Sequence, residues 1–331
     1  RKKNFRWDLN FIYTRNRNKI ISLHPDVGEY KSLEGSPSGG NLRIGSVAYI
    51  GGEYGVLLSD SKPLEFWAKD AQGNIVDDPR NGKQVLTWDD GNLGAYPLRS
   101  NEIQKVGTIS PKFEGSIYNS FKIKNVDINF LIDMRFGGYM ASVSSKYGTA
   151  YGFLDRSLVG RDEKYGGITY RSKYAEKGYG TFHDGIIPDG VFQQGTRVRT
   201  PEGNMVDVGG MTYKEAYENG YVEPTHVSFY QARIGDFSTG VVTDNWFNEI
   251  KYIALRNVSI GYTFPERIAH KLKLSNLRLS LDAHNLCYLY NSLPNRINPE
   301  SFSGNTSAGS FFEQNFAPYT ATYAFTIKFN L

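Results

Sequence analysis

The feature that most constrains this chain is a strict alternation of apolar and polar residues along unusually long segments. In the stretch LRNVSIGYTFP (residues 255–265), every second residue from Val258 to Phe264 is apolar, and the residues between them are polar or glycine. Successive side chains of a β-strand point to opposite sides, so this stretch is predicted to be a strand with one apolar and one polar face. The fold then depends on whether the apolar face contacts a protein core or lipid.

The same alternation recurs along much of the sequence. The segments are FRWDLNFIYT (5–14), KFEGSIYNSF (112–121), NVDINFLIDMRFGG (125–138), NLRLSLDAHNL (276–286) and YTATYAFTIKFNL (319–331). They are longer than the five or six residues typical of strands in globular proteins. A strand tilted by about 45° needs roughly nine to eleven residues to cross the hydrocarbon of a membrane. Aromatic residues also gather near the predicted strand ends, as in the interfacial girdles of membrane barrels.

Composition agrees with a β-rich chain and excludes several classes of protein. The 331 residues include 23 Tyr, 20 Phe and 35 Gly, which suit pleated surfaces and turns. The single cysteine, Cys287, rules out an internal disulfide and a thiolate metal cluster, and it is interpreted as a small apolar filler at a strand end. A net charge of +4 does not indicate a nucleic-acid partner. The sequence contains no run of 18 consecutive apolar residues, so it predicts no transmembrane helix.

The predicted connections alternate between short and long. Residues 122–125 (KIKN) form a tight hairpin, and residues 264–274 form a compact connection opened by a proline. The polar segments 60–111, 141–249 and 288–317 are much longer. Short turns on one side and long loops on the other are typical of outer-membrane barrels. The sequence therefore predicts an all-β fold, in which this chain supplies about seven or eight strands of a transmembrane antiparallel β-barrel with long extracellular loops.

Three segments carry a resemblance to a known family. Residues 248–286 resemble the penultimate hairpin of SusC/RagA-type TonB-dependent transporters, in which a strand of the form LR…N…GY.FP precedes a segment L.…LR…….NL. Residues 106–138, with the Pro-Lys-Phe entry and the Gly-Gly exit, resemble the preceding hairpin, and residues 16–23 (NRNKIISL) match another strand end. The final Leu331 departs from the family, because barrel-assembly signals usually end in an aromatic residue; Phe329 lies two positions earlier.

The resemblance implies a 22-stranded barrel with an N-terminal plug and a segment that contacts TonB. Neither plug nor TonB-contacting segment is found here, so residues 1–331 are expected to be the C-terminal part of such a barrel, completed by the remainder of the same polypeptide. The start of the chain does not read as a signal peptide, because it has no apolar h-region. The implied partners are a SusD-like surface lipoprotein, TonB and outer-membrane lipid. The implied function, in the outer membrane of a Gram-negative bacterium, is active import of an oligomeric nutrient, a glycan or an oligopeptide, with no chemical step and no cofactor.

Aromatic side chains in the predicted loops are candidates for substrate binding, because aromatic faces stack on sugars or cover peptide side chains. These candidates are Trp67, Trp88, Trp246, Tyr147 and Tyr151, with Tyr165, Tyr170 and Tyr179 as further members of the group. The alternative is that these rings pack the loops together or onto a partner. Charged residues on the polar faces of the strands are candidates for lining the lumen, with a structural salt-bridge network as the alternative: Asp133, Arg135, Arg278, Asp282 and His284.

Other functions have weaker support in the sequence. The pairs His183–Asp184 and Thr225–His226 lie outside any hydrolase motif, and residues 178–185 (GYGTFHDG) are interpreted as a turn rather than a phosphate loop. The acidic pairs Asp77–Asp78 and Asp89–Asp90 fit no calcium-loop spacing. Two alternatives remain beside the importer: a soluble β-sandwich module that binds carbohydrate or acts as an adhesin, and a small barrel enzyme such as an outer-membrane lipase.

Overall fold

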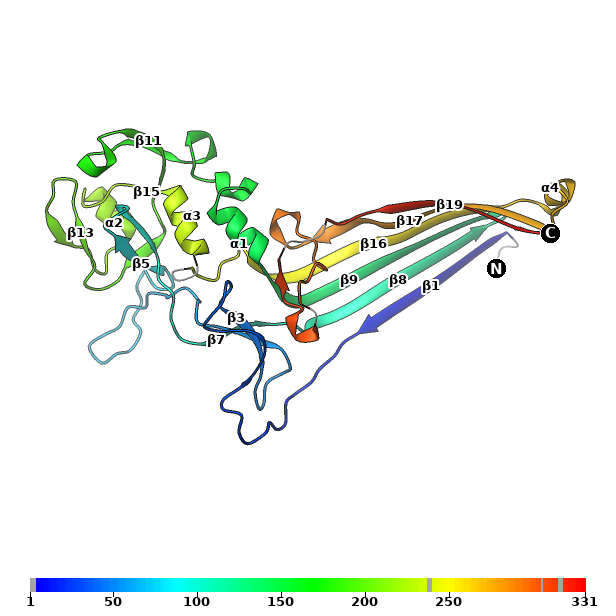
Figure 1. Cartoon of the computed structure of the whole chain (residues 1–331), viewed down its shortest axis with the longest axis horizontal. Coiled ribbons are helices and arrows are strands. Elements are labelled where there is room, and N and C mark those ends of the chain that lie inside the picture. The colour runs from blue at the N-terminus through cyan, green and yellow to red at the C-terminus, as the bar shows by residue number, and fades with distance from the viewer. Residues whose placement is uncertain (1–3, 237–239, 305, 315–317) are drawn as a thin grey trace.

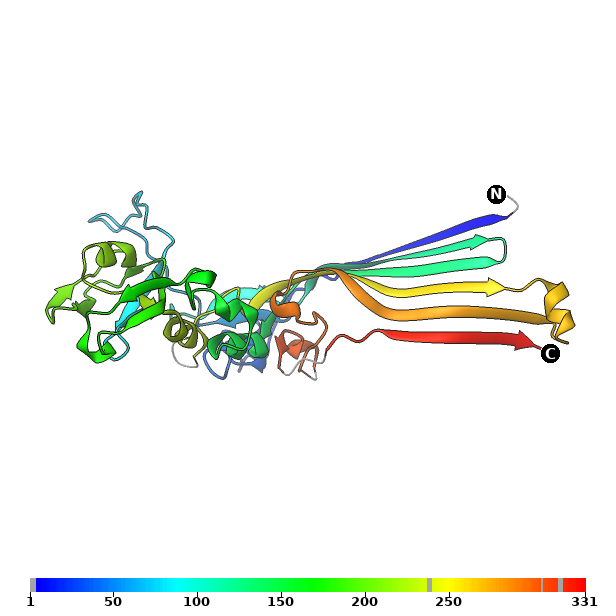
Figure 2. The ribbon, with the colours of Figure 1, turned by 90° about the horizontal axis from the view of Figure 1, so that it is seen from above.

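The structure is a computed structural model that describes residues 4–236, 240–304, 306–314 and 318–331. Six long strands form one antiparallel sheet that extends away from a body of shorter elements (Figures 1 and 2). The long strands, in sheet order, are β1 (Phe5–Thr14), β8 (Pro111–Ile123), β9 (Val126–Ser142), β16 (Phe247–Thr263), β17 (Asn276–Asn291) and β19 (Thr322–Asn330). A two-residue strand, β18 (Phe312–Glu313), pairs with β9 in parallel. The prediction of an all-β fold is confirmed.

Among the described residues the main sheet is open and contains seven strands, six of them long. Residues 16–23, which resemble a strand end of the family, lie outside every strand. Strands β1 and β19 lie at opposite edges, and among the described residues each pairs with one neighbour, so the sheet is open. A closed 22-stranded barrel is therefore not seen in this chain. None of the described helices is long and apolar enough to span a membrane.

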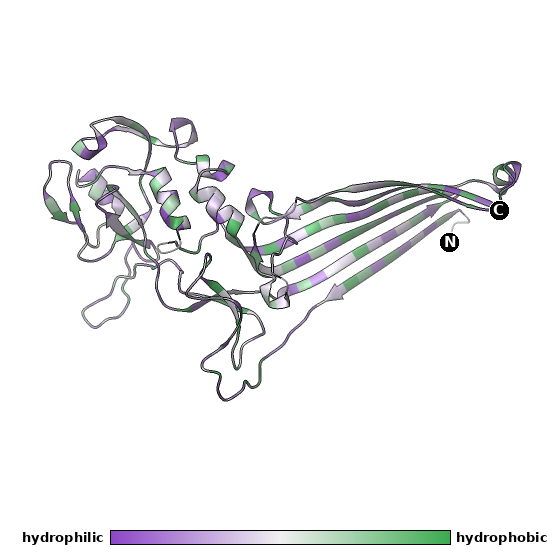
Figure 3. Cartoon of the chain, viewed as in Figure 1, coloured by the Kyte–Doolittle hydropathy of each residue, from purple (hydrophilic) through white to green (hydrophobic). Residues whose placement is uncertain are grey.

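The register keeps the two faces of the sheet distinct across all six strands. One row of paired residues is entirely apolar: Trp7, Phe121, Ile128, Ile260, Leu281 and Phe325. The next row along the strands is polar apart from one alanine: Asp8, Ser120, Asn129, Ser259, Asp282 and Ala324. We call the side that carries the first row the apolar face and the side that carries the second the polar face. The alternation is visible along the strands in Figure 3.

The apolar face has no protein cover along much of its area. Trp7 is 55% exposed, Ile260 50%, Leu281 63% and Phe325 60%. A soluble sandwich requires a second sheet against this face, and the described residues provide none over these side chains. A continuous exposed apolar surface of this kind marks a protein or membrane contact.

The short connections lie at one end of the sheet, as predicted. Ile123 pairs with Val126, so the hairpin between β8 and β9 is only two residues long, and Lys124 adopts φ 54° in the left-handed region to close it. Strands β16 and β17 are joined through a short helix, α4 (Glu266–Lys271), which follows Pro265. A proline that precedes the first turn of a helix is favourable because it lacks only an N–H that the helix leaves unpaired.

The predicted long loops at the other end of the sheet, together with residues 15–59, are folded into further strands and helices. They contain three more sheets and a hairpin: β2–β3–β4–β7, β10–β11–β15, β12–β5–β6 and β13–β14. The bounds are β2 Lys31–Gly35, β3 Ile44–Ala48, β4 Val56–Ser59, β5 Gln84–Asp89, β6 Gly94–Pro97, β7 Gln104–Thr108, β10 Ile168–Arg171, β11 Thr181–Ile186, β12 Gly190–Phe192, β13 Arg197–Arg199, β14 Met205–Asp207, β15 Thr225–His226, α1 Val143–Ala150, α2 Tyr213–Glu218 and α3 Val227–Gly235.

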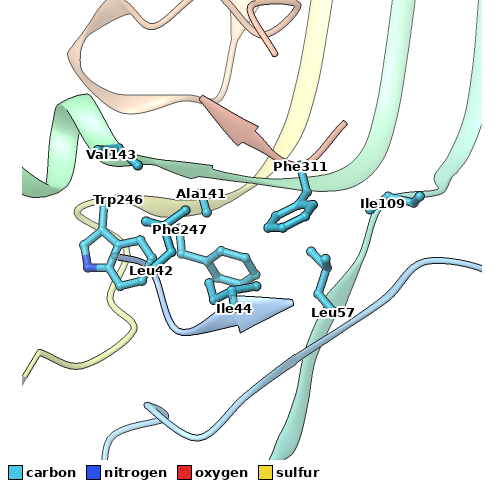
Figure 4. Packing of buried hydrophobic residues seen from close by; sticks show 9 residues of the cluster. All are labelled: Leu42, Ile44, Leu57, Ile109, Ala141, Val143, Trp246, Phe247 and Phe311. Atoms are coloured by element: carbon cyan, nitrogen blue, oxygen red, sulfur yellow. The ribbon is translucent and has the colours of Figure 1, made fainter. Parts of the chain in front are cut away.

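Two buried clusters hold this outer body together. One joins the end of the long sheet to β3 and β4 and consists of Leu42, Ile44, Leu57, Ile109, Ala141, Val143, Trp246, Phe247 and Phe311 (Figure 4). The other lies around β5, β12 and α2 and includes Leu86, Phe192, Val198 and Tyr213. Helix α2 begins with a capping box, in which Thr212 and Glu215 bind each other's backbone N–H groups. Residues 237–239, 305 and 315–317 of the long segments lie outside the described residues.

Candidate functional site

An ion pair crosses the polar face of the sheet above Gly261. The Arg278 guanidinium on β17 reaches over β16 and donates from Nη2 to Asp127 Oδ2 on β9, at 2.5 Å. A Cβ at position 261 would lie 2.2 Å from Arg278 Nη2 and 2.7 Å from Asp127 Oδ2. The glycine of the motif LRNVSIGYTFP therefore has a steric reason: it leaves room for a side-chain bridge between the two flanking strands.

Two further lumen candidates, Asp282 and His284, also have partners on the polar face. Asp282 accepts hydrogen bonds from Ser259 at 2.6 Å, Ser280 at 2.9 Å and Thr326 at 3.2 Å, which come from three adjacent strands. His284 Nδ1 lies 2.9 Å from Asn257 Oδ1. Both side chains are therefore bonded to residues of neighbouring strands on the polar face.

Arg256, which the candidate set did not include, organises the outer end of the polar face. It follows Leu255, where the register of β16 shifts, and such a bulge redirects a side chain. Its Nη2 lies 3.0 Å from Asp133 Oδ2 and 2.6 Å from Glu300 Oε1. The sequence offered one indication of Arg256: together with Leu255 it forms the Leu-Arg pair of the segment that resembles the family.

Arg135 lies on the same face and is also engaged. Its Nη2 donates to the carbonyl of Ile109 at 3.2 Å, and its guanidinium lies 5.8 Å from the ring centre of Phe302. All five predicted lumen residues thus occupy one face of one sheet. Their bonds go to neighbouring residues rather than to one another, and these bonds are compatible both with a structural network and with lining a path.

The tryptophan candidates fall into three different environments. Trp67 is 46% exposed on a hairpin formed by residues 64–84, and its indole N–H donates to Glu65 at 3.3 Å. Trp88 is partly buried against the β5–β12–α2 cluster and donates to Asp90 at 2.8 Å. Trp246 is only 2% exposed within the cluster of Figure 4. Because Trp246 is buried, it cannot stack on a substrate in this structure. For this residue the alternative interpretation, that the ring packs the loops together, applies.

Lys146 explains part of the environment of Trp246. Its ammonium lies 5.0 Å from the indole centre and donates to the carbonyl of Asn41 at 2.5 Å. Burial lowers the pKa of Lys146 to about 8, although the nearby Asp236 opposes this shift. The partly desolvated ammonium of Lys146 thus lies over the face of the Trp246 ring on which a substrate would have to stack.

Tyr151 is the most exposed of the aromatic candidates, and it stacks on the partly buried Tyr147. Their rings stack at 5.9 Å with an interplanar angle of 14°, and Tyr151 is 65% exposed. Phe153, which the candidate set missed, extends the group: it lies 6.5 Å from Tyr151 and is 82% exposed. We call Tyr147, Tyr151 and Phe153 the aromatic platform. Tyr147 comes from α1, and the other two follow the helix directly.

The remaining tyrosines do not join this platform in any contact between described side chains. Tyr179 is 57% exposed and Tyr165 37%, whereas Tyr170 is partly buried beside Lys177, whose ammonium lies 5.5 Å from its ring. Burial, with the nearby carboxylate of Glu223, raises the pKa of Tyr170. This tyrosine belongs to the interior of the outer body.

The structure gives the weaker candidates structural partners. His226 Nδ1 lies 2.9 Å from Asp184 Oδ1, and the Tyr170 hydroxyl lies 3.4 Å from His226 Nε2. Among the acidic pairs, Asp78 binds Arg80 at 2.6 Å and Asp89 binds Arg233 at 2.6 Å. In the part of the chain that the structure describes, no group of three or more His, Cys, Asp or Glu side chains could hold a metal ion.

The fold and its two faces define an all-β protein whose main sheet is amphipathic and open. No family model matches the chain, and no curated protein matches it. Solved structures of the RagAB peptide importer are similar: the closed-closed state gives 11% identity and a TM-score of 0.49, and covers 99% of this chain and 28% of that one. The open-open state gives 11% identity and a TM-score of 0.49, with 100% and 27% covered. A RagAB peptide transporter structure gives 12% and 0.48, with 99% and 28% covered. The chain spans less than a third of the length of these relatives.

Proposed function

We propose that this chain forms part of the wall and mouth of an outer-membrane importer. One observation carries the proposal: the six long strands present an exposed apolar face on one side and a hydrogen-bonded charged face on the other. A water-soluble protein would bury the apolar face, whereas a membrane barrel turns it toward acyl chains and turns the polar face toward its lumen. The strands, of 9 to 17 residues, are long enough for this role.

The same proposal accounts for the free edges of β1 and β19. Unpaired backbone N–H and C=O groups are costly in hydrocarbon, so a sheet in a membrane must close on itself. We propose that further strands of the same polypeptide complete the barrel, and that a plug, TonB and a SusD-like lipoprotein act with it, as the sequence resemblance implies. The work is then binding and release of an oligomeric glycan or oligopeptide, without a chemical step.

Membrane fractionation of the native organism tests the proposal. The protein is expected in the outer-membrane fraction, to need detergent for extraction, and to migrate differently on gels before and after boiling, as folded barrels do. Recovery as a monodisperse protein in buffer without detergent would contradict it.

The aromatic platform is the proposed contact with the nutrient. Tyr151 and Phe153 are exposed, Tyr151 stacks on the partly buried Tyr147, and all three are carried by the outer body rather than by the sheet. Replacement of Tyr151 and Phe153 by alanine is expected to reduce uptake while the amount of protein in the membrane stays unchanged. Glu218→Gln, at an exposed pair with Lys214 on α2, is a matched surface control. Uptake of fractionated glycan and peptide digests by the same cells separates the two nutrient classes.

A further inference from the structure

Residues 292–303, which we call the strap, follow the outer end of β17 and lie against the sheet near the start of β16 (Figure 1, orange). Ser292 begins the strap with two hydrogen bonds to β16: its Oγ donates to the carbonyl of Glu249 at 2.7 Å and accepts from the backbone N–H of Lys251 at 2.8 Å. The strap is therefore bonded to the sheet from its first residue.

The strap lies on the polar face, not on the apolar face. Tyr252 pairs with Arg135, and Ala254 pairs with Asp133, so all four residues share the polar side of the sheet. Leu293 (7% exposed) and Ile297 (1%) of the strap pack with Tyr252 and Ala254 in one buried cluster. Apolar residues at the outer end of the polar face are thus covered by the strap instead of facing a lumen.

Glu300 anchors the second half of the strap. Its carboxylate receives Arg256 Nη2 at 2.6 Å, the Tyr288 hydroxyl at 2.9 Å and the Tyr252 hydroxyl at 3.3 Å. Arg256 is also held by Asp133, so the anchor is connected to β9 as well as to β16 and β17. Charge-assisted hydrogen bonds of this kind are the strong ones in proteins, and several acting together define one position.

A second, independent contact holds the far part of the strap. The ring of Phe302 lies 5.8 Å from the Arg135 guanidinium, which itself donates to the backbone of the connection before β8. The strap therefore runs from β17 across β16 to β9 and overlies three strands of the polar face.

We propose that the strap narrows the solute path at the outer end of the polar face, and that Glu300 is the positioning residue that keeps it there. The inference rests on the proposed function, because it takes the polar face as the side along which the nutrient passes. A segment bonded at both ends to the wall limits the width of what can pass, and so contributes to size selection.

Reagent access to a cysteine just inward of the strap tests this inference. Leu131 lies on the polar face, two residues inward of Asp133 and opposite Asn257. Leu131→Cys gives a single reporter when Cys287 and any other cysteine of the full-length protein are replaced by serine. Whole cells carrying the full-length protein are treated from outside with small N-ethylmaleimide or with a bulky polyethylene-glycol maleimide, which carry the same reactive group. The strap is loosened by Glu300→Gln combined with Phe302→Ala. Asp8→Asn, which removes the partner of Arg6 on the exposed edge strand, is the control.

The expected result is selective for size. The small reagent reacts at similar rates in all forms, whereas the bulky one reacts about tenfold faster once the strap is loosened, the shift expected for loss of charge-assisted contacts. Hydrogen exchange of residues 292–303 is measured in parallel and is expected to increase. Equal reaction rates for both reagents with the strap intact would overturn the inference. It would also be overturned if the double variant showed increased hydrogen exchange in the strap but an unchanged rate with the bulky reagent, or if its hydrogen exchange were unchanged. Failure of the proposed function is recognised separately, by fractionation.

Discussion

A lysine on the apolar face gives the sharpest test of what surrounds the sheet. Leu9 lies in the middle of β1, on the apolar face, and its side chain is 53% exposed. If this face is in water, Leu9→Lys changes an exposed position and alters the free energy of unfolding by less than about 0.5 kcal/mol. If it faces acyl chains, the lysine sits near the middle of the apolar band and costs about 2–4 kcal/mol.

Position 10 provides a matched control, because Asn10 is exposed at the same depth on the opposite, polar face. Asn10→Lys introduces the same charge into the same strand and is expected to have little effect in either case. The assay is reversible denaturant unfolding of the full-length protein in lipid vesicles, with outer-membrane abundance as a second readout. A difference of about 3 kcal/mol between the variants corresponds to a factor of roughly 150 in the folding equilibrium. Equal and small effects would refute the membrane assignment of this face.

Three further variants test individual contacts. Gly261→Val would place side-chain atoms where Arg278 crosses the sheet, so we expect the free energy of unfolding to fall by about 1–3 kcal/mol in the same unfolding assay. The smaller Gly261→Ser is expected to show only part of this loss. Burial lowers the pKa of Lys146 from 10.5 to about 8, so between these pH values the unfolded chain binds a proton that the folded chain lacks. The stability of the protein should therefore rise with pH across this range. Thermal unfolding measured against pH should show this rise, and Lys146→Met should abolish it. Asn119 is 8% exposed on the apolar face and accepts a hydrogen bond from the Trp7 indole at 3.2 Å. Trp7→Phe leaves the Asn119 amide without this partner, so it should destabilise the protein more than Trp7→Phe combined with Asn119→Leu. Additive losses of stability would contradict this pairing.

The sheet was predictable because its information is local. A period of two over ten or more residues fixes a strand and its faces, and Trp7, Ile260 and Phe325 fall in one apolar row as the alternation requires. Residues 16–23 resemble a strand end of the family but adopt no strand here. A short sequence match carries no information about pairing partners.

The outer end of the sheet was not predictable from periodicity. Ile250, Tyr252 and Ala254 continue the alternation of β16, yet they are apolar on the side that is polar further along. Their cover, Leu293 and Ile297, lies about 40 residues away in the sequence. Whether such a face meets solvent or another segment depends on tertiary packing, which a single strand does not encode.

The folded state of the long segments bears on how the importer would select its nutrient. Contacts that join distant residues build this region: the Ala95 N–H donates to Thr225 at 3.1 Å across 130 positions, and the Ser46 hydroxyl donates to the Ala308 carbonyl at 2.7 Å across 262. A platform such as Tyr151 and Phe153 on an ordered body loses little conformational entropy on binding, so its stacking energy is retained as affinity. We therefore propose that selectivity arises from two fixed features in series, the exposed rings on the outer body and the bonded strap over the polar face.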